Sequence, residues 1–197
     1  MARADSIDGA PPRPASASYP GREIDEMAGQ EHELVMAAQG GSKRAFESLH
    51  LRHGRLVHGI LLAKVPREAA DDLVQEVFTQ AWVGLRTLRD PGAFGSWIAQ
   101  MARRRAADFH RTRARTASVP VDARHAGRMS DPEQALLVID LIKSLPEAYI
   151  EPLMLRLVEG MSGPEIAEAT GLTHGSVRIN LSRGYALLRS RIAEDRR

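Results

Sequence analysis

Apolar side chains recur at spacings of three and four residues through most of this chain, and no convincing alternation of apolar and polar residues occurs. That period predicts amphipathic α-helices, because a half-buried strand would need a period of two. The helical pattern fills residues 31–115 and 131–197, and it is interrupted over residues 116–130 by "TASVPVDARHAGRMS". We therefore predict an all-α fold of two small helical domains joined by a flexible linker.

The first 30 residues lack this helical pattern. Four prolines lie between Pro11 and Pro20, and large aliphatic side chains are almost absent. Such a segment cannot bury enough apolar surface to offset the entropy lost on ordering. We predict a disordered tail over residues 1–30, and a partner-binding tail is the alternative that composition leaves open.

Three features that the sequence lacks indicate the cellular compartment of the protein. The chain contains no cysteine, which excludes disulfides and thiolate zinc sites. No apolar run approaches the ~18–20 residues of a membrane span, and the N-terminus lacks the apolar core of a secretory signal. These features predict a cytoplasmic protein without membrane insertion.

Capping residues predict where the helices begin and end. In the first block Gly40 and Gly41 break the pattern, Ser42 caps a long helix and Pro66 ends it. In the second block the expected start signals are Asp131, Ser144, Ser162 with Glu165, and Thr173.

The stretch "MSGPEIAEATGLTHGSVRINLSRG", residues 161–184, has the pattern of a helix-turn-helix. A short helix ends at the Gly171-Leu172 turn, and Thr173 begins a second helix. At 100° per residue, one face of that second helix carries Val177, Leu181, Leu188 and Ile192, and the other carries Arg178, Ile179, Ser182 and Arg183. Arginine can donate two hydrogen bonds to guanine, and Asn180 and Ser182 can bond to bases or phosphates. This stretch alone leaves an ordinary solvated helix face equally open.

A cluster of basic residues lies in the first block. Six arginines and one acid, Asp108, occur over residues 103–115, giving a local charge of +5 in a chain whose formal net charge is only +2. Trp97 and Phe109 flank the cluster, and Phe94 lies just before it. Basic side chains beside aromatic rings suit nucleic acid, because phosphates attract the charge and exposed bases stack on rings. The alternative is that the aromatic residues belong to the core of an amphipathic helix.

The helix "DDLVQEVFTQAW" has a different exposed face. Asp72, Gln75, Glu76 and Thr79 form an acidic and amide stripe at spacings of three and four residues. Such a stripe does not hold phosphates and fits a basic protein surface better, although a solvated helix face is the simpler reading of this helix alone.

Enzymatic and metal-binding functions have little support. The chain has no Walker loop, Gly-rich dinucleotide turn or nucleophile elbow, so we predict that it is not an enzyme and uses no cofactor. His50, His53 and His58 are close enough to suggest a metal cluster, but no cysteine or matching carboxylate pair accompanies them. A dimeric repressor would explain the helix-turn-helix, but neither the acidic stripe nor the basic aromatic helix.

Taken together, these stretches resemble bacterial sigma factors. "AFESLHLRHGRLV", "DDLVQEVFTQAW" and "FGSWIAQMARRRAADF" look like the second conserved region of that family. "LIKSLPEAYIEPLMLRLVEGMSGPEIAEATGLTHGSVRINLSRGYALLR" looks like the fourth. Only these two regions are present, and a short linker joins them, which is typical of the extracytoplasmic-function group. The resemblance covers roughly residues 32 to 192.

The resemblance implies promoter-specific initiation of transcription, with core RNA polymerase, promoter DNA and an anti-sigma factor as partners. Asp72, Gln75 and Glu76 match positions that dock on the clamp coiled-coil of the largest polymerase subunit. The positions implied for melting and reading the −10 element are Phe94, Trp97, Arg103, Arg104, Arg105 and Arg111. The positions expected to read the −35 element are Thr173, His174, Ser176, Arg178, Ile179, Asn180, Ser182 and Arg183.

Overall fold

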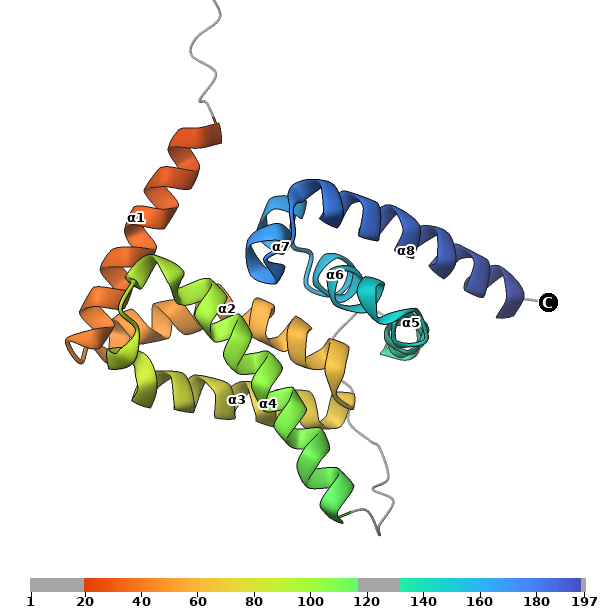
Figure 1. Ribbon diagram of the computed structural model, residues 1–197, viewed down its shortest axis with the longest axis horizontal. Helices are drawn as coiled ribbons and strands as arrows, with labels where there is room; N and C mark the ends of the chain where they lie inside the picture. Colours follow the sequence, from red (N-terminus) through yellow and green to blue (C-terminus); the bar gives the residue numbers. More distant parts are fainter. Residues whose placement is uncertain (1–19, 117–131, 196–197) are drawn as a thin grey trace, which may run out of the picture.

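The protein is described here by a computed structural model that covers residues 20–116 and 132–195 (Figure 1). Every regular element within those two ranges is a helix, so the expected all-α fold is confirmed. The expected linker, residues 116–130, lies outside the described residues apart from Thr116. None of the described helices is both long and apolar enough to cross a membrane.

The first block contains four α-helices and two short 3₁₀ helices. They are α1 (Pro20–Gln39), α2 (Lys43–Lys64), α3 (Arg67–Gly84), η1 (Leu85–Thr87), η2 (Pro91–Ala93) and α4 (Phe94–Thr116). In this block α2 lies against α1, α3 and α4. Its core is mainly aliphatic with two buried phenylalanine rings, Phe78 and Phe94, and its fully buried side chains include Leu49, Ile60, Leu61 and Ile98.

Helix α1 begins earlier than the sequence pattern predicts. We expected a disordered tail through residue 30, but the helix starts at Pro20. Residues 1–19, the rest of that expected tail, lie outside the described residues. Proline at a first helical position costs little, and the following glutamates, alanine and glutamine favour helix. Further along, the helix is anchored by Val35 and Ala38, which are buried.

The expected break before α2 is confirmed. Gly41 has a positive φ of 98°, a conformation that favours glycine, and Ser42 Oγ accepts a hydrogen bond from the Ala45 amide at 3.3 Å. At the other end the α-helix stops at Lys64, and Val65, the residue before Pro66, is extended.

The second block contains α5 (Pro132–Lys143), α6 (Glu147–Leu157), α7 (Gly163–Thr170) and α8 (His174–Asp195). The capping box of Ser162 and Glu165 is present, and Gly171 ends α7 in the left-handed conformation with φ 70°. Ser144 does not cap α6, because Pro146 takes the cap position and Ser144 Oγ donates instead to the Leu141 carbonyl at 2.8 Å. The expected cap Asp131 lies outside the described residues.

The two blocks lie against each other, which the sequence pattern did not predict. Helix α2 packs on α6, and α4 packs on α7 (Figure 1). The core therefore continues from one block to the next, with the buried residues of α2 and α6 in one cluster.

Candidate nucleic-acid interface

Helices α7 and α8 form the expected helix-turn-helix. Thr173 Oγ1 accepts a hydrogen bond from the Ser176 amide at 3.1 Å and so caps α8. On the inner face Val177 and Leu188 are buried, while Leu181 and Ile192 are half-buried. A Cβ on Gly184 would lie 2.8 Å from Leu153 Cδ1, so α8 crosses α6 at a point where no side chain fits between them.

The opposite face of α8 is open to solvent. Arg178, Ile179, Ser182 and Arg183 are all exposed, and Ile179 presents 48% of its surface, as expected. The other candidate residues lie at the edges of this face. Thr173 and His174 are exposed, Asn180 and Ser176 are half-buried, and the Ser176 hydroxyl lies 2.9 Å from Thr173 Oγ1 within the cap.

The arginines of α4 differ in their surroundings. Arg104 is exposed, and within the described residues it has no hydrogen bond or ion pair. Arg103 and Arg105 are half-buried and bound to carboxylates of other helices, as described below. Arg111 forms an ion pair with Asp108 one helical turn away. The basic cluster is therefore only partly available to phosphates in this structure.

The aromatic residues before this cluster also differ from one another. Phe94 is 0% exposed, and its ring packs edge-on against His53 with centroids 5.1 Å apart. In this structure the fully buried ring of Phe94 offers no surface to a base, so the predicted contact of Phe94 with DNA gains no support from exposure and stays a prediction. Trp97 packs beside Phe94 at 5.8 Å but keeps part of its ring at the surface.

The acidic stripe of α3 faces solvent. Asp72, Gln75 and Glu76 are exposed, whereas Leu73 and Val74 between them are buried. Glu76 Oε2 accepts a hydrogen bond from Arg105 Nε at 2.5 Å. A candidate polymerase contact and a candidate −10 contact are therefore joined within the same block.

Two acids that the sequence reasoning missed lie between the blocks. Glu151 of α6 accepts hydrogen bonds from Arg103 Nε at 3.2 Å and from an Arg103 Nη at 2.6 Å, and it lies 3.6 Å from Lys64 Nζ. Glu159, just beyond α6, contacts His58 of α2 at 2.6 Å. The available signal was a single acid inside the apolar run "YIEPLML".

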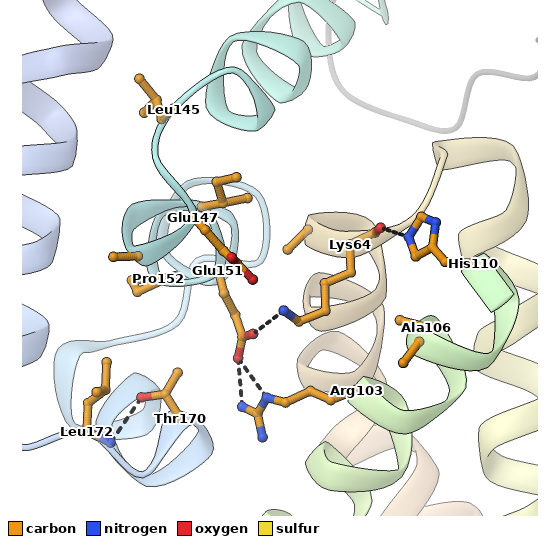
Figure 2. A pocket seen from close by; sticks show the side chains of 14 residues that line it. Lys64, Arg103, Ala106, His110, Leu145, Glu147, Glu151, Pro152, Thr170 and Leu172 are labelled. Atoms are coloured by element: carbon orange, nitrogen blue, oxygen red, sulfur yellow. Dashed lines mark hydrogen bonds and ion pairs between the residues drawn. The ribbon is translucent and has the colours of Figure 1, made fainter. Parts of the chain in front are cut away.

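Figure 2 shows the groove beside Glu151, which has a volume of about 910 Å³. Lys64, Arg103 and His110 line the side formed by the first block, and Glu151 projects toward them from the second. The His110 Nε2 lies 2.6 Å from the Lys64 carbonyl at the end of α2. The ion pairs of Glu151 with Lys64 and Arg103 join the two blocks at one side of the groove.

The histidines of α2 have separate neighbours. His53 Nε2 lies 3.0 Å from Glu31 Oε2, His58 contacts Glu159, and His50 packs against the Phe78 ring. Within residues 20–116 and 132–195, no three histidines, cysteines or acids are grouped so that they could hold a metal ion.

A helix-turn-helix with an exposed arginine-bearing face, next to a basic helix with a surface tryptophan, defines a DNA-binding protein. Comparisons with known proteins identify the family within this class. The family models for Sigma-70 region 2 and Sigma-70 region 4 match residues 49–116 and 135–188, respectively.

Several relatives match most of the chain. The ECF RNA polymerase sigma-E factor of Haemophilus influenzae is 30% identical over 81% of this chain and 93% of its own length. The sigma factor CarQ of Myxococcus xanthus is 32% identical over 78% and 92%, respectively. The solved structure of CnrH in complex with the cytosolic domain of CnrY covers 84% of this chain and 99% of its own, with 25% identity and a TM-score of 0.63. The chain belongs to the extracytoplasmic-function sigma factors of the sigma-70 family, which direct promoter-specific initiation of transcription.

Proposed function

We propose that α8 reads the −35 element of the promoter in the major groove. The observation that carries this assignment is the division of α8 into a packed face and an exposed face with Arg178, Ile179, Ser182 and Arg183. The exposed face can enter the groove without disturbing the core, because Val177 and Leu188 hold α8 from the other side. The positions of Arg178 and Arg183 differ by about 140° around the helix, so one suits a base edge and the other the backbone.

Helix α4 supplies the surface for the −10 element. Its exposed or half-buried arginines, Arg103, Arg104, Arg105 and Arg111, attract the phosphates of the separated strand, and the surface part of Trp97 gives a base a ring to stack on. Support for this role comes from charge and exposure, and it does not extend to Phe94, whose ring is buried in this structure.

Helix α3 docks on core polymerase. Asp72, Gln75 and Glu76 present carboxylate and amide groups that fit the basic face of the clamp coiled-coil in the largest subunit. Since polymerase and promoter DNA are its partners, the protein acts in the cytoplasm as a binding factor and carries out no catalysis itself. The solved CnrH is bound to the cytosolic domain of CnrY, and an anti-sigma factor is the corresponding partner for this chain.

A −35 saturation library tests the assignment of α8. Core polymerase is loaded with the wild type, Arg178→Ala or Arg183→Ala, and transcripts are sequenced to score each base. A lost two-bond contact to guanine costs about 1–3 kcal/mol and relaxes preference at one base pair, whereas a lost phosphate contact weakens all promoters alike. We expect both variants to transcribe less and at least one to change base preference.

The matched control is Arg191→Ala, which removes an exposed arginine of the same helix well beyond the turn. It should keep the base preference of the wild type. Unchanged activity and preference in both Arg178→Ala and Arg183→Ala would reject α8 as the reader.

A further inference from the structure

Helix α1 contacts the segment of chain that leads into the proposed −10 surface. This segment, residues 85–93, contains η1 and η2, joins α3 to α4 and lies against α1 (Figure 1). We call it the α3–α4 connection. Gln39, the last residue of α1, donates from Nε2 to the Leu85 carbonyl at 3.0 Å and to the Leu88 carbonyl at 2.8 Å. One amide group of α1 therefore holds the start of η1 and the residue that follows it.

Glu31, about two turns earlier in α1, holds the far end of the α3–α4 connection. Its carboxylate accepts a hydrogen bond from the Gly95 amide and lies 3.0 Å from His53 Nε2. The first amides of a helix have no partner within that helix, so an acceptor on a neighbouring helix helps to fix where α4 begins. A Cβ built on Gly95 would lie 3.3 Å from His53 Cε1, so the start of α4 packs directly against this pair.

These contacts reach Trp97, the ring that α4 offers to a base. A Cβ built on Gly84 would lie 3.7 Å from Trp97 Cζ2, so the indole lies beside the backbone at the end of α3. The next residue is Leu85, whose carbonyl is held by Gln39, and the indole also packs against Phe94. The backbone that supports Trp97 is therefore fixed by an amide that belongs to neither α3 nor α4.

We propose that Gln39 is a positioning residue for the −10 strand, which holds the α3–α4 connection so that Trp97 is oriented to stack on a base. This inference rests on the proposed function of α4 and names a residue outside α4 on which that function depends. Gln39 acts through the backbone and does not contact DNA. A ring that is already oriented loses less conformational entropy when a base stacks on it. Removing the restraint therefore weakens stacking and leaves the phosphate contacts intact.

The test compares Gln39→Met, which keeps the length of the side chain but removes the amide, with Gln39→Lys, which restores N–H donors. Gln30→Met, at an exposed position of the same helix, is the matched control. Each full chain is assembled with core polymerase, and the Kd is measured by fluorescence anisotropy for two labelled single strands. One strand carries a −10 sequence selected from a promoter library. The other has the same backbone with abasic sites in place of the −10 bases.

A second measurement reports on the ring itself and needs no DNA. Trp82→Phe in each free chain leaves Trp97 as the only tryptophan, and acrylamide quenching of its emission reports how accessible the ring is. Circular dichroism checks that each chain is folded. If Gln39→Met loses helix content, Gln39→Asn takes its place, because its shorter amide cannot reach both carbonyls.

We expect Gln39→Met to bind the base-bearing strand roughly tenfold more weakly than the wild type, as the loss of stacking on one base predicts. Its affinity for the abasic strand should equal that of the wild type, and quenching of Trp97 should increase. Gln39→Lys and Gln30→Met should keep the wild-type ratio of the two affinities. The added charge of Gln39→Lys acts on both strands alike and leaves that ratio unchanged.

Equal weakening with both strands, or wild-type affinity for both, would overturn the role of Gln39. Wild-type protein that binds both strands equally well would instead show that the −10 assignment of α4 is wrong. Quenching of Trp97 then decides whether Gln39 holds the ring, and unchanged quenching in Gln39→Met would reject it. The two failures are therefore distinguishable.

Discussion

At the scale of single residues, two of the arginines expected to contact DNA are already engaged within the chain. Arg103 is bound by Glu151, and Arg105 by Glu76. A phosphate or a polymerase residue would therefore have to replace the carboxylate that each arginine already binds. The net free energy of binding is then the energy of the new ion pair minus the energy of the one that is lost. Solvent and salt screen a half-buried ion pair less than an exposed one. Breaking the Arg103–Glu151 pair should therefore cost more free energy than breaking the Arg105–Glu76 pair, because Glu151 is less exposed than Glu76.

The contact of His58 with Glu159 should make the packing of the two blocks depend on pH. The hydrogen bond to Glu159 raises the pKa of His58 above 6.5, burial opposes this rise, and Asp71 and Arg67 of α3 act in opposite directions. A raised pKa means that protonated His58 stabilises the contact between the blocks. This stabilisation is complete below pH 6.5 and is lost as pH rises through the raised value. We expect the distance between spin labels at Gln80→Cys of α3 and Arg189→Cys of α8, two exposed positions, to lengthen over that rise.

The control for this prediction is His32→Gln, which removes an exposed histidine of α1 and should leave the pH profile unchanged. His58→Gln should flatten the profile near the value that the wild type reaches at high pH. A wild-type profile that is already flat from pH 6 to pH 9 would contradict the role of His58.

At the scale of elements, the helices and their ends follow from local sequence. Ser42, the Ser162–Glu165 capping box, Gly171 and Thr173 act where their side chains or backbone freedom predict. The face of α8 was also predictable, because a period of 3.6 separates Val177 from Arg178 without tertiary information. The predicted cap at Ser144 was wrong because two local signals compete there. Pro146 holds the N-cap position of α6 in place of Ser144.

The capping box of α7 supports the first helix of the helix-turn-helix. Ser162→Ala removes the acceptor for the Glu165 amide and should cost about 1 kcal/mol of unfolding free energy, measured by urea titration at pH 7. The Ser162 hydrogen bonds lower the pKa of Glu165 below 4.5, so their contribution is present above pH 4.5 and is lost as pH falls through the lowered value. Ser190→Ala, at an exposed site on α8, is the matched control and should stay close to the wild type. A loss for Ser162→Ala no larger than this control would contradict the capping role.

At the scale of the whole molecule, the contact between the two blocks could not be predicted from the sequence. Glu151 reads locally as one acid on a helix, Gly59 as a weak point in α2, and His58 as a possible metal ligand. Their shared role depends on how α2 and α6 approach each other, and this is a property of the packed pair and not of either helix. For the same reason the burial of Phe94 could not be predicted from its position beside the basic cluster, which suggested an exposed ring.

The packing of the two blocks leaves one proposed binding surface exposed and covers part of the other. Asp72 and Gln75 of α3 are exposed, whereas Arg103 of α4 is covered by the second block. The surface proposed for polymerase is therefore accessible in this structure while Arg103 of the proposed −10 surface is covered.

The most direct test of the account is transcription from a promoter library by core polymerase loaded with this chain. We predict initiation from a defined set of promoters with wild-type protein, and loss of that initiation with Asp72→Ala combined with Gln75→Ala. That pair should also weaken binding to core polymerase in a pull-down titration while helix content stays unchanged. Glu47→Ala, at an exposed acid of α2, should transcribe like the wild type. Full initiation and unaltered polymerase affinity in the Asp72 and Gln75 variant, or no selective initiation with the wild type, would contradict the account.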